Sequence, residues 1–172
     1  MKYETFKLTT TKQRPACAGF TMIEVLIAIF VLAVGLLGLA GLQVTSLKNN
    51  TSSYTRSQAQ LLAYDMLDRM RSNSQGVING AYDDLLSVTP TDPNCITSGC
   101  SVAQIAEYDA YEWSELVAQT LPTGTGLVEG NGPGSIFTIT VMWDDEHTGA
   151  SGTNCSGDSA ADLTCFSLSS TL

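Results

Sequence analysis

The stretch that decides the fold runs from residue 19 to residue 42 and reads GFTMIEVLIAIFVLAVGLLGLAGL. Its last eighteen residues, 25–42, carry no charge. At about 1.5 Å per helical residue they nearly match a hydrocarbon core of about 30 Å, so this segment predicts a membrane helix. Residues 43–46 (QVTS) offer no A-x-A cleavage site, which argues against an ordinary secretory signal.

One carboxylate, Glu24, stands at the start of the apolar run, four residues after Phe20. A carboxylate in lipid costs about 2–3 kcal/mol at the bilayer centre and less near its edge. This cost favours a functional role for Glu24 over the alternative, a tolerated charge at the membrane edge.

Charge differs sharply on the two sides of this segment. The chain has 172 residues with 8 Lys+Arg and 17 Asp+Glu, and this length predicts one domain plus an appendage. Four bases precede Gly19, and residues 72–172 carry thirteen acids and no base. Because short basic segments stay in the cytoplasm, the N-terminus is expected inside and the acidic part outside. The net charge of −9 argues against a nucleic acid partner.

The stretch Gly19-Phe20-Thr21-Met22-Ile23-Glu24-Val25-Leu26, after a basic leader, resembles the type IV pilin and pseudopilin superfamily. The resemblance implies that a prepilin peptidase cuts after Gly19 and that Phe20 becomes the N-methylated first residue. It also implies that Glu24 assists assembly by meeting the amino terminus of a neighbouring subunit. A charge pair in register is tolerated in an apolar bundle where single charges are costly.

The resemblance divides the chain into a leader (1–19), a transmembrane and assembly helix (20–43), an amphipathic continuation of that helix (44–72) and an extracytoplasmic head (73–172). No Pro or Gly interrupts residues 43–71, so one helix from Phe20 to Arg71 is expected, about 78 Å long. Its head-facing stripe is predicted from two sets of apolar residues, Leu47, Tyr54 and Leu61 at seven-residue spacing and Leu62, Met66 and Met70 beside them.

The head pattern predicts one more helix and then strands. Ser101-Val102-Ala103-Gln104 has the form of a capping box, and the helix is expected to end before Leu121-Pro122. Its apolar stripe holds Val102, Ile105, Ala106, Trp113, Leu116 and Val117. Strands are expected at 126–129, 136–143 and 165–168, with Phe137, Ile139, Val141 and Trp143 facing the core. The fold class is therefore α+β, a long helix on a small antiparallel sheet, as in type IV pilins.

Four cysteines would remain after removal of the leader, which contains Cys17: Cys95, Cys100, Cys155 and Cys165. An even number outside the cytoplasm predicts disulfides, and three pairings are possible. The local pairs Cys95–Cys100 and Cys155–Cys165 are favoured because each closes a segment rich in Gly, Ser and Asn. A zinc site is the less favoured alternative, since the chain has no C-x-x-C and a single histidine.

Other candidate sites are weak. Asp109 lies near the stripe of the second helix and is expected to be interfacial or bonded to backbone, rather than catalytic. Asp144-Asp145-Glu146-His147 could offer oxygen ligands to Ca²⁺, but it lacks the spacing of an EF-hand, so a solvated turn is expected and no metal or cofactor is assigned. No nucleophile with a base is identifiable, and we expect no enzyme.

The head motifs narrow the resemblance to the minor pilins called type IV pilus modification protein PilV: residues 65–73, Cys100 with the helix after it, Leu121-Pro122 and residues 140–144. It implies a minor pilin in the inner membrane with a periplasmic head, later built into a surface pilus near its tip. Implied partners are the major pilin, other minor pilins, prepilin peptidase and the pilus assembly platform. The alternatives are a type II secretion minor pseudopilin and, in a different class, a membrane-tethered binding module or adhesin.

Overall fold

A computed structural model describes residues 19–85 and 89–172, so the leader apart from Gly19 lies outside the described residues. The chain forms two compact units, one that ends at Thr45 and one from Ser46 to Leu172. The helix α1 (Met22–Ser72) continues from the first unit into the second. Each unit is described by itself below.

In the second unit, α1 packs one face against the head. Its buried residues recur every three or four positions, which is the spacing of one helix face: Thr55, Ala59, Leu62, Ala63, Met66, Leu67 and Met70. The expected stripe of Leu62, Met66 and Met70 is confirmed. The other expected stripe is wrong, since Leu47, Tyr54 and Leu61 are 62–66% exposed. They lie on the side of α1 that faces away from the core.

The end of α1 is fixed by Asn73, which caps the short helix α2 (Ser74–Ile78). The Asn73 side chain accepts from the backbone N–H of Gly76 and donates to the carbonyl of Val102 at 2.8 Å. The end expected at Arg71 is therefore correct to within one residue, and α2 follows it directly. Two small elements come next that the sequence did not reveal, β1 (Asp84–Leu85) and α3 (Cys95–Ser98).

The second expected helix is α4 (Val102–Thr120), and both bonds of its capping box are present. Ser101 accepts from the backbone of Gln104, and Gln104 accepts in return from the backbone of Ser101. Ala106, Trp113 and Val117 are buried as expected, but Ile105 and Leu116 are 37% and 41% exposed. The buried face of α4 is therefore narrower than its apolar stripe.

Four antiparallel strands form one sheet in the order β1-β2-β3-β4. The three longer strands are β2 (Thr125–Glu129), β3 (Ile136–Trp143) and β4 (Thr164–Thr171). The expected inner face of β3 is confirmed, since Phe137, Ile139, Val141 and Trp143 are at most 1% exposed. Thr140 and Met142 on its other face are buried too, so the C-terminal half of β3 is covered on both sides.

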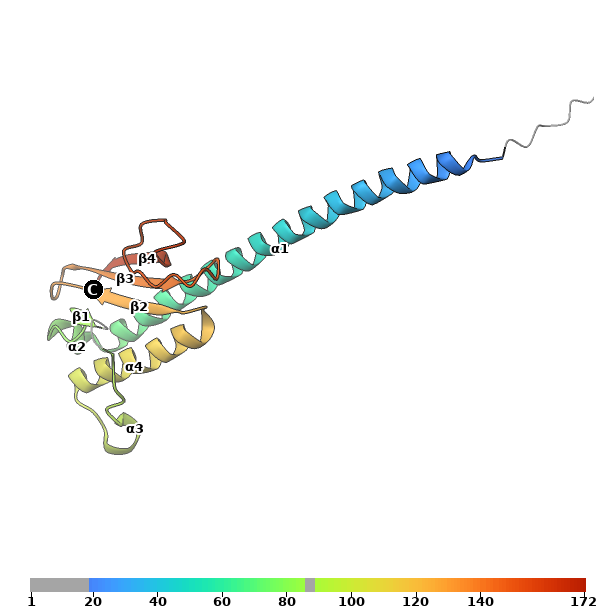
Figure 1. The fold of residues 1–172 in the computed structure, drawn as a ribbon. Coiled ribbons are helices and arrows are strands. Elements are labelled where there is room, and N and C mark those ends of the chain that lie inside the picture. Colours follow the sequence, from blue (N-terminus) through green and yellow to red (C-terminus); the bar gives the residue numbers. More distant parts are fainter. Residues whose placement is uncertain (1–18, 86–88) are drawn as a thin grey trace, which may run out of the picture. The chain divides into compact units, whose positions relative to one another are not determined.

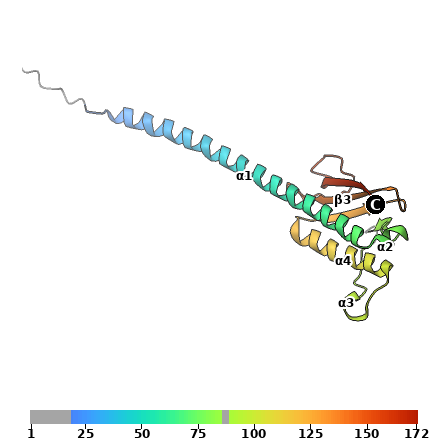
Figure 2. The ribbon, with the colours of Figure 1, turned by 180° about the vertical axis from the view of Figure 1, so that it is seen from behind.

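The core of the head lies where α1, α4 and the inner face of the sheet meet, and Figures 1 and 2 show α4 beside the second half of α1. Trp113 of α4 connects all three parts. Its indole Nε1–H donates to the Leu62 carbonyl of α1 at 2.7 Å. Its ring covers Gly126 of β2 so closely that a Cβ there would lie 2.3 Å from the ring carbons Cη2 and Cζ3. A side chain at Gly126 would therefore displace the tryptophan.

Two disulfides close local segments of the head. Cys95 is bonded to Cys100 around α3, and Cys155 is bonded to Cys165 at the start of β4. These are the two local pairs favoured by the sequence. The second pair ties the loop that precedes β4 to the second residue of that strand.

We predict that Gly126→Ala lowers the free energy of unfolding by about 1–3 kcal/mol, the usual cost of overpacking a filled core. Thermal unfolding of the full chain in detergent, followed by near-ultraviolet circular dichroism, measures this change. The exposed neighbour on the same strand provides the control, and Thr125→Ala should unfold within a degree or two of the wild type. Equal unfolding temperatures for both variants would show that the contact between Trp113 and Gly126 leaves space for a side chain.

Candidate functional site

The first candidate site is the N-terminal end of α1. Gly19 and Phe20 precede the helix, and Thr21 caps it by accepting from the backbone N–H of Glu24 through its carbonyl at 3.1 Å and its hydroxyl at 3.4 Å. Glu24 therefore lies in the first helical turn, where a negative charge is favoured by the helix dipole. Phe20 and Glu24 lie together, lining one concave surface of about 380 Å³ with Val25, Ala28, Ile29 and Leu32.

The apolar side chains of this segment are all exposed within the structure. The exposed fraction is 84% for Phe20, and the large apolar residues from Met22 to Leu42 are between 48% and 86% exposed. Leaving this much apolar surface in water costs about 25 cal/mol per Å², so cover by lipid or by other helices would stabilise this segment. Among the described residues, α1 is the one helix long and apolar enough to cross a membrane.

Three glycines interrupt the exposed apolar surface at Gly35, Gly38 and Gly41. Apart from the neighbouring residues and the backbone of the helix itself, no atom lies within 4 Å of the position that a Cβ would take at any of them. Their small size leaves shallow places on the helix where another helix can approach closely.

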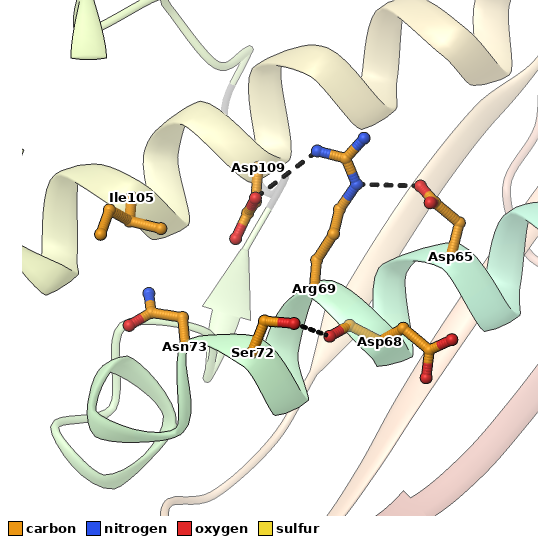
Figure 3. Close-up of a pocket in the computed structure, with 7 residues that line it drawn as sticks. All are labelled: Asp65, Asp68, Arg69, Ser72, Asn73, Ile105 and Asp109. Atoms are coloured by element: carbon orange, nitrogen blue, oxygen red, sulfur yellow. Dashed lines mark hydrogen bonds and ion pairs between the residues drawn. The ribbon is translucent and has the colours of Figure 1, made fainter. Parts of the chain in front are cut away.

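The second candidate site is a polar network between α1 and α4, centred on Arg69 (Figure 3). The Arg69 guanidinium donates to Asp65 at 2.9 Å from Nε, and from Nη1 to Glu112 at 3.0 Å and to Asp109 at 3.5 Å. Tyr82 donates its hydroxyl to the other oxygen of Asp109 and accepts from Asn73 at 3.2 Å. The network therefore joins both helices to the segment after α2.

Burial and hydrogen bonding shift the ionisation of this network. Burial raises the pKa of Asp109, and the hydrogen bond from Tyr82 and the charge of Arg69 only partly offset it. Burial and the bond to Asp109 also raise the pKa of the Tyr82 hydroxyl. Burial alone would lower the pKa of Arg69, but its bonds to Asp65 and Glu112 raise it above the usual value. Tyr82 thus stays protonated and Arg69 charged at neutral pH.

The contacts of this network hold elements of the head together. A cavity of about 330 Å³ lies beside the network, lined by Asp65, Asp68, Arg69, Ser72, Asn73, Ile105 and Asp109 (Figure 3). Within the described part of the chain, every buried side-chain nitrogen or oxygen atom has a hydrogen-bond partner. Asp109 is interfacial as expected, but its partners are the side chains of Arg69 and Tyr82 and not backbone.

The cluster at residues 144–147 forms the expected turn and exposes Glu146 and His147, but its two aspartates are bound to the protein rather than solvated. Asp144 is only 4% exposed and accepts from the backbone of Thr148 and Gly149 at 3.1 and 2.8 Å. Asp145 accepts from Thr55 at 2.7 Å, from the Trp143 indole at 2.9 Å and from Ser52. These carboxylates bind the loop to the head and to α1. Across residues 19–85 and 89–172, no group of three His, Cys, Asp or Glu is placed to hold a metal ion.

Sequence reasoning missed most of the polar network. Tyr82 and Asn73 lie in a region without clear periodicity, and nothing local marks Arg69 as the partner of a residue forty positions away. The one available signal was that Asp109 falls among the residues of a buried helix face, where a carboxylate requires a partner.

Two matches to known families bear on the class of protein. The long N-terminal helix, the small antiparallel sheet and the further short helix agree with a type IV pilin fold. Residues 41–111 match the family described as type IV pilin Tt1218, and residues 14–40 match the prokaryotic N-terminal methylation motif. No curated protein and no solved structure gives a significant match. The two matches support the pilin superfamily for this chain and suggest a structural, membrane-anchored protein made as a prepilin.

A pH dependence of stability follows from Asp145. Burial would raise its pKa, but the hydrogen bonds from Ser52, Trp143 and Thr55 lower it below the usual value. The folded state therefore prefers the ionised form, so this stabilisation is complete above the ordinary pKa of about 4 and is lost as the pH falls through the lower, folded pKa.

We predict that Asp145→Asn lowers the free energy of unfolding at pH 7 by about 1–3 kcal/mol, because an amide cannot accept all three bonds. The variant should also lose less stability than the wild type between pH 5 and pH 2. Urea unfolding of the full chain in detergent at several pH values measures both effects. Glu115→Gln, at an exposed position of α4, is the control and should follow the wild-type curve. Parallel curves for Asp145→Asn and the wild type would contradict the prediction.

Proposed function

We propose that this chain is a minor type IV pilin that prepilin peptidase cuts between Gly19 and Phe20 and that then enters a pilus, in or near its tip. The observation that carries the proposal is the match of residues 14–40 to the N-terminal methylation motif, at the start of a helix whose large apolar side chains are exposed from Met22 to Leu42. In this proposal the leader is residues 1–19 and Phe20 is N-methylated.

The proposed location follows from the same segment. Residues 20–43 anchor the chain in the inner membrane, the bases before Gly19 keep the N-terminus in the cytoplasm, and the acidic head lies in the periplasm. Both disulfides form there, because that compartment is oxidising. The assembly platform then draws the helix out of the lipid, and other pilins replace the lipid around it.

Glu24 is proposed as the residue that sets the stagger between subunits. It shares a concave surface with Phe20, so the carboxylate and the new amino terminus would lie at the same end of the helix. In an apolar surrounding, each charge needs an opposite charge, and the amino terminus of an adjacent subunit can supply it.

The processing step predicts the behaviour of Gly19→Val. A branched side chain at the residue before the cut should block the peptidase, and the 172-residue precursor should remain in the inner membrane. Mass spectrometry of the membrane fraction measures the chain length. Gly41→Ala is the control, since it lies in open space on α1 and should be processed like the wild type. A normally shortened Gly19→Val chain would reject the prepilin assignment.

Assembly predicts the behaviour of Glu24→Ala. Removing the carboxylate removes the cost of placing it in lipid, so the variant should insert and be cut after Gly19 as well as the wild type. It should nevertheless be depleted from sheared pili by about tenfold, because losing about 1.4 kcal/mol of pairing free energy lowers the equilibrium constant for incorporation tenfold. Quantitative mass spectrometry of sheared pili measures the depletion, with Glu24→Asp as the variant that keeps the charge.

The same preparation tests the alternatives. A wild-type chain that is cut after Gly19 but absent from sheared pili would contradict the pilus assignment and favour a secretion pseudopilin or a membrane-tethered module. A Glu24→Ala chain that enters pili at the normal level would reject the pairing role of Glu24 alone.

A further inference from the structure

One edge of the sheet is open. β4 is an eight-residue strand at the end of the strand order, and within the described residues its one partner strand is β3. Its sequence, TCFSLSST, contains no charge and no proline. An edge strand presents unpaired N–H and C=O groups, and proteins usually protect such an edge with charge, proline, a bulge or a very short strand.

The opposite edge of the sheet has such protection. β1 is two residues long and one of them is Asp84, so this edge is both short and charged. The β1 edge of the sheet is therefore protected against pairing, whereas the β4 edge is not. The difference indicates that β4 is left available for pairing.

The hydrophobic core is also incompletely covered at β4. Phe137, Ile139 and Val141 of β3 are fully buried, whereas their neighbours on β4 along the same face, Phe166 and Leu168, are only partly buried, as is Leu172. A strand added beside β4 would cover these three side chains and pair the open backbone. The open backbone and the partly buried side chains of this edge would thus both be covered by one added strand.

We infer that β4 accepts a strand from the head of a different pilin subunit, which extends the sheet by β-augmentation. This inference rests on the proposed function and names the surface through which the head selects its neighbour. The incoming strand would carry apolar side chains at alternate positions facing the core, and it would be uncharged on that face because a charge there would be buried.

Charge argues for a different subunit rather than a second copy. Residues 46–172 carry four bases against fifteen acids, and no base follows Arg71. Two such heads repel each other, whereas a neutral or basic head is attracted. The occupant is therefore expected to have a less acidic head than this chain.

The test uses cells that make the native pilus and a photoreactive phenylalanine analogue at Ser167, an exposed position of β4. Irradiation of intact cells should give one adduct with another pilin, identified by mass spectrometry of the crosslinked peptide. The adduct forms in the inner membrane or in pili, so it is measured even where the chain is absent from sheared pili.

Matched variants at adjacent positions show whether the adduct reports strand addition. Ser170 pairs with Phe137 and lies on the core side, whereas Ser169 pairs with Thr138 on the outer side. Ser170→Lys stays solvated at an open edge but would be buried by an added strand, so it should reduce the adduct by about tenfold or more. Ser169→Lys makes the same charge change on the outer side, and Ser170→Gln introduces a larger polar side chain without the charge, so both should leave the adduct within about twofold.

The thermal unfolding of each variant, measured on the isolated full chain in detergent, should match the wild type within a few degrees. An adduct of this chain with itself, equal adducts from Ser170→Lys and Ser169→Lys, or no adduct at all would overturn the inference. None of these results would affect the processing after Gly19 or the presence in sheared pili. An experiment that rejects strand addition at β4 can therefore be distinguished from one that rejects the proposed function.

Discussion

The head depends on one buried side chain, Trp113, because it is the point at which a segment of α1, a helix from the middle of the chain and the sheet are brought together. Its indole bonds to the Leu62 carbonyl, and its ring occupies the space that the missing side chain of Gly126 leaves open. A large aromatic ring contributes much buried area, and a buried N–H requires a partner. Both requirements are met in a single arrangement, which fixes where α4 lies relative to α1.

Carboxylates make this packing more specific, because each binds particular partner side chains. Arg69 holds three acids from two helices, and Asp145 ties the loop after β3 to the first turns of α1 in the head. Both sets of contacts lie at least partly away from water, where hydrogen bonds to a charged group stabilise by more than neutral ones. They also bind segments that are far apart in the sequence, so the acidic residues of the head are not simply a source of solubility.

The proposed assembly makes use of surfaces that the fold does not cover. The N-terminal half of α1 exposes its apolar side chains all around, which suits lipid first and other helices later. In the head, β4 leaves its backbone and part of the core uncovered, which suits a strand of a neighbouring subunit. A pilin with these two surfaces would be held in a filament by apolar packing of its helix, with Glu24 setting the stagger, and would choose its neighbour through its head.

The sequence by itself determined the long helix, the capping box at Ser101, the inner face of β3 and the apolar character of residues 19–42. Each of these follows from a local pattern of periodicity, capping or charge. It could not decide which of two stripes on α1 meets the head, and the set of Leu47, Tyr54 and Leu61 was the wrong choice. It also gave no sign of the bonds of Arg69 to Asp109 or of Asp145 to Thr55. Only the tertiary structure decided these, because the face that a helix buries and the partner that a charge finds depend on segments forty to ninety residues away.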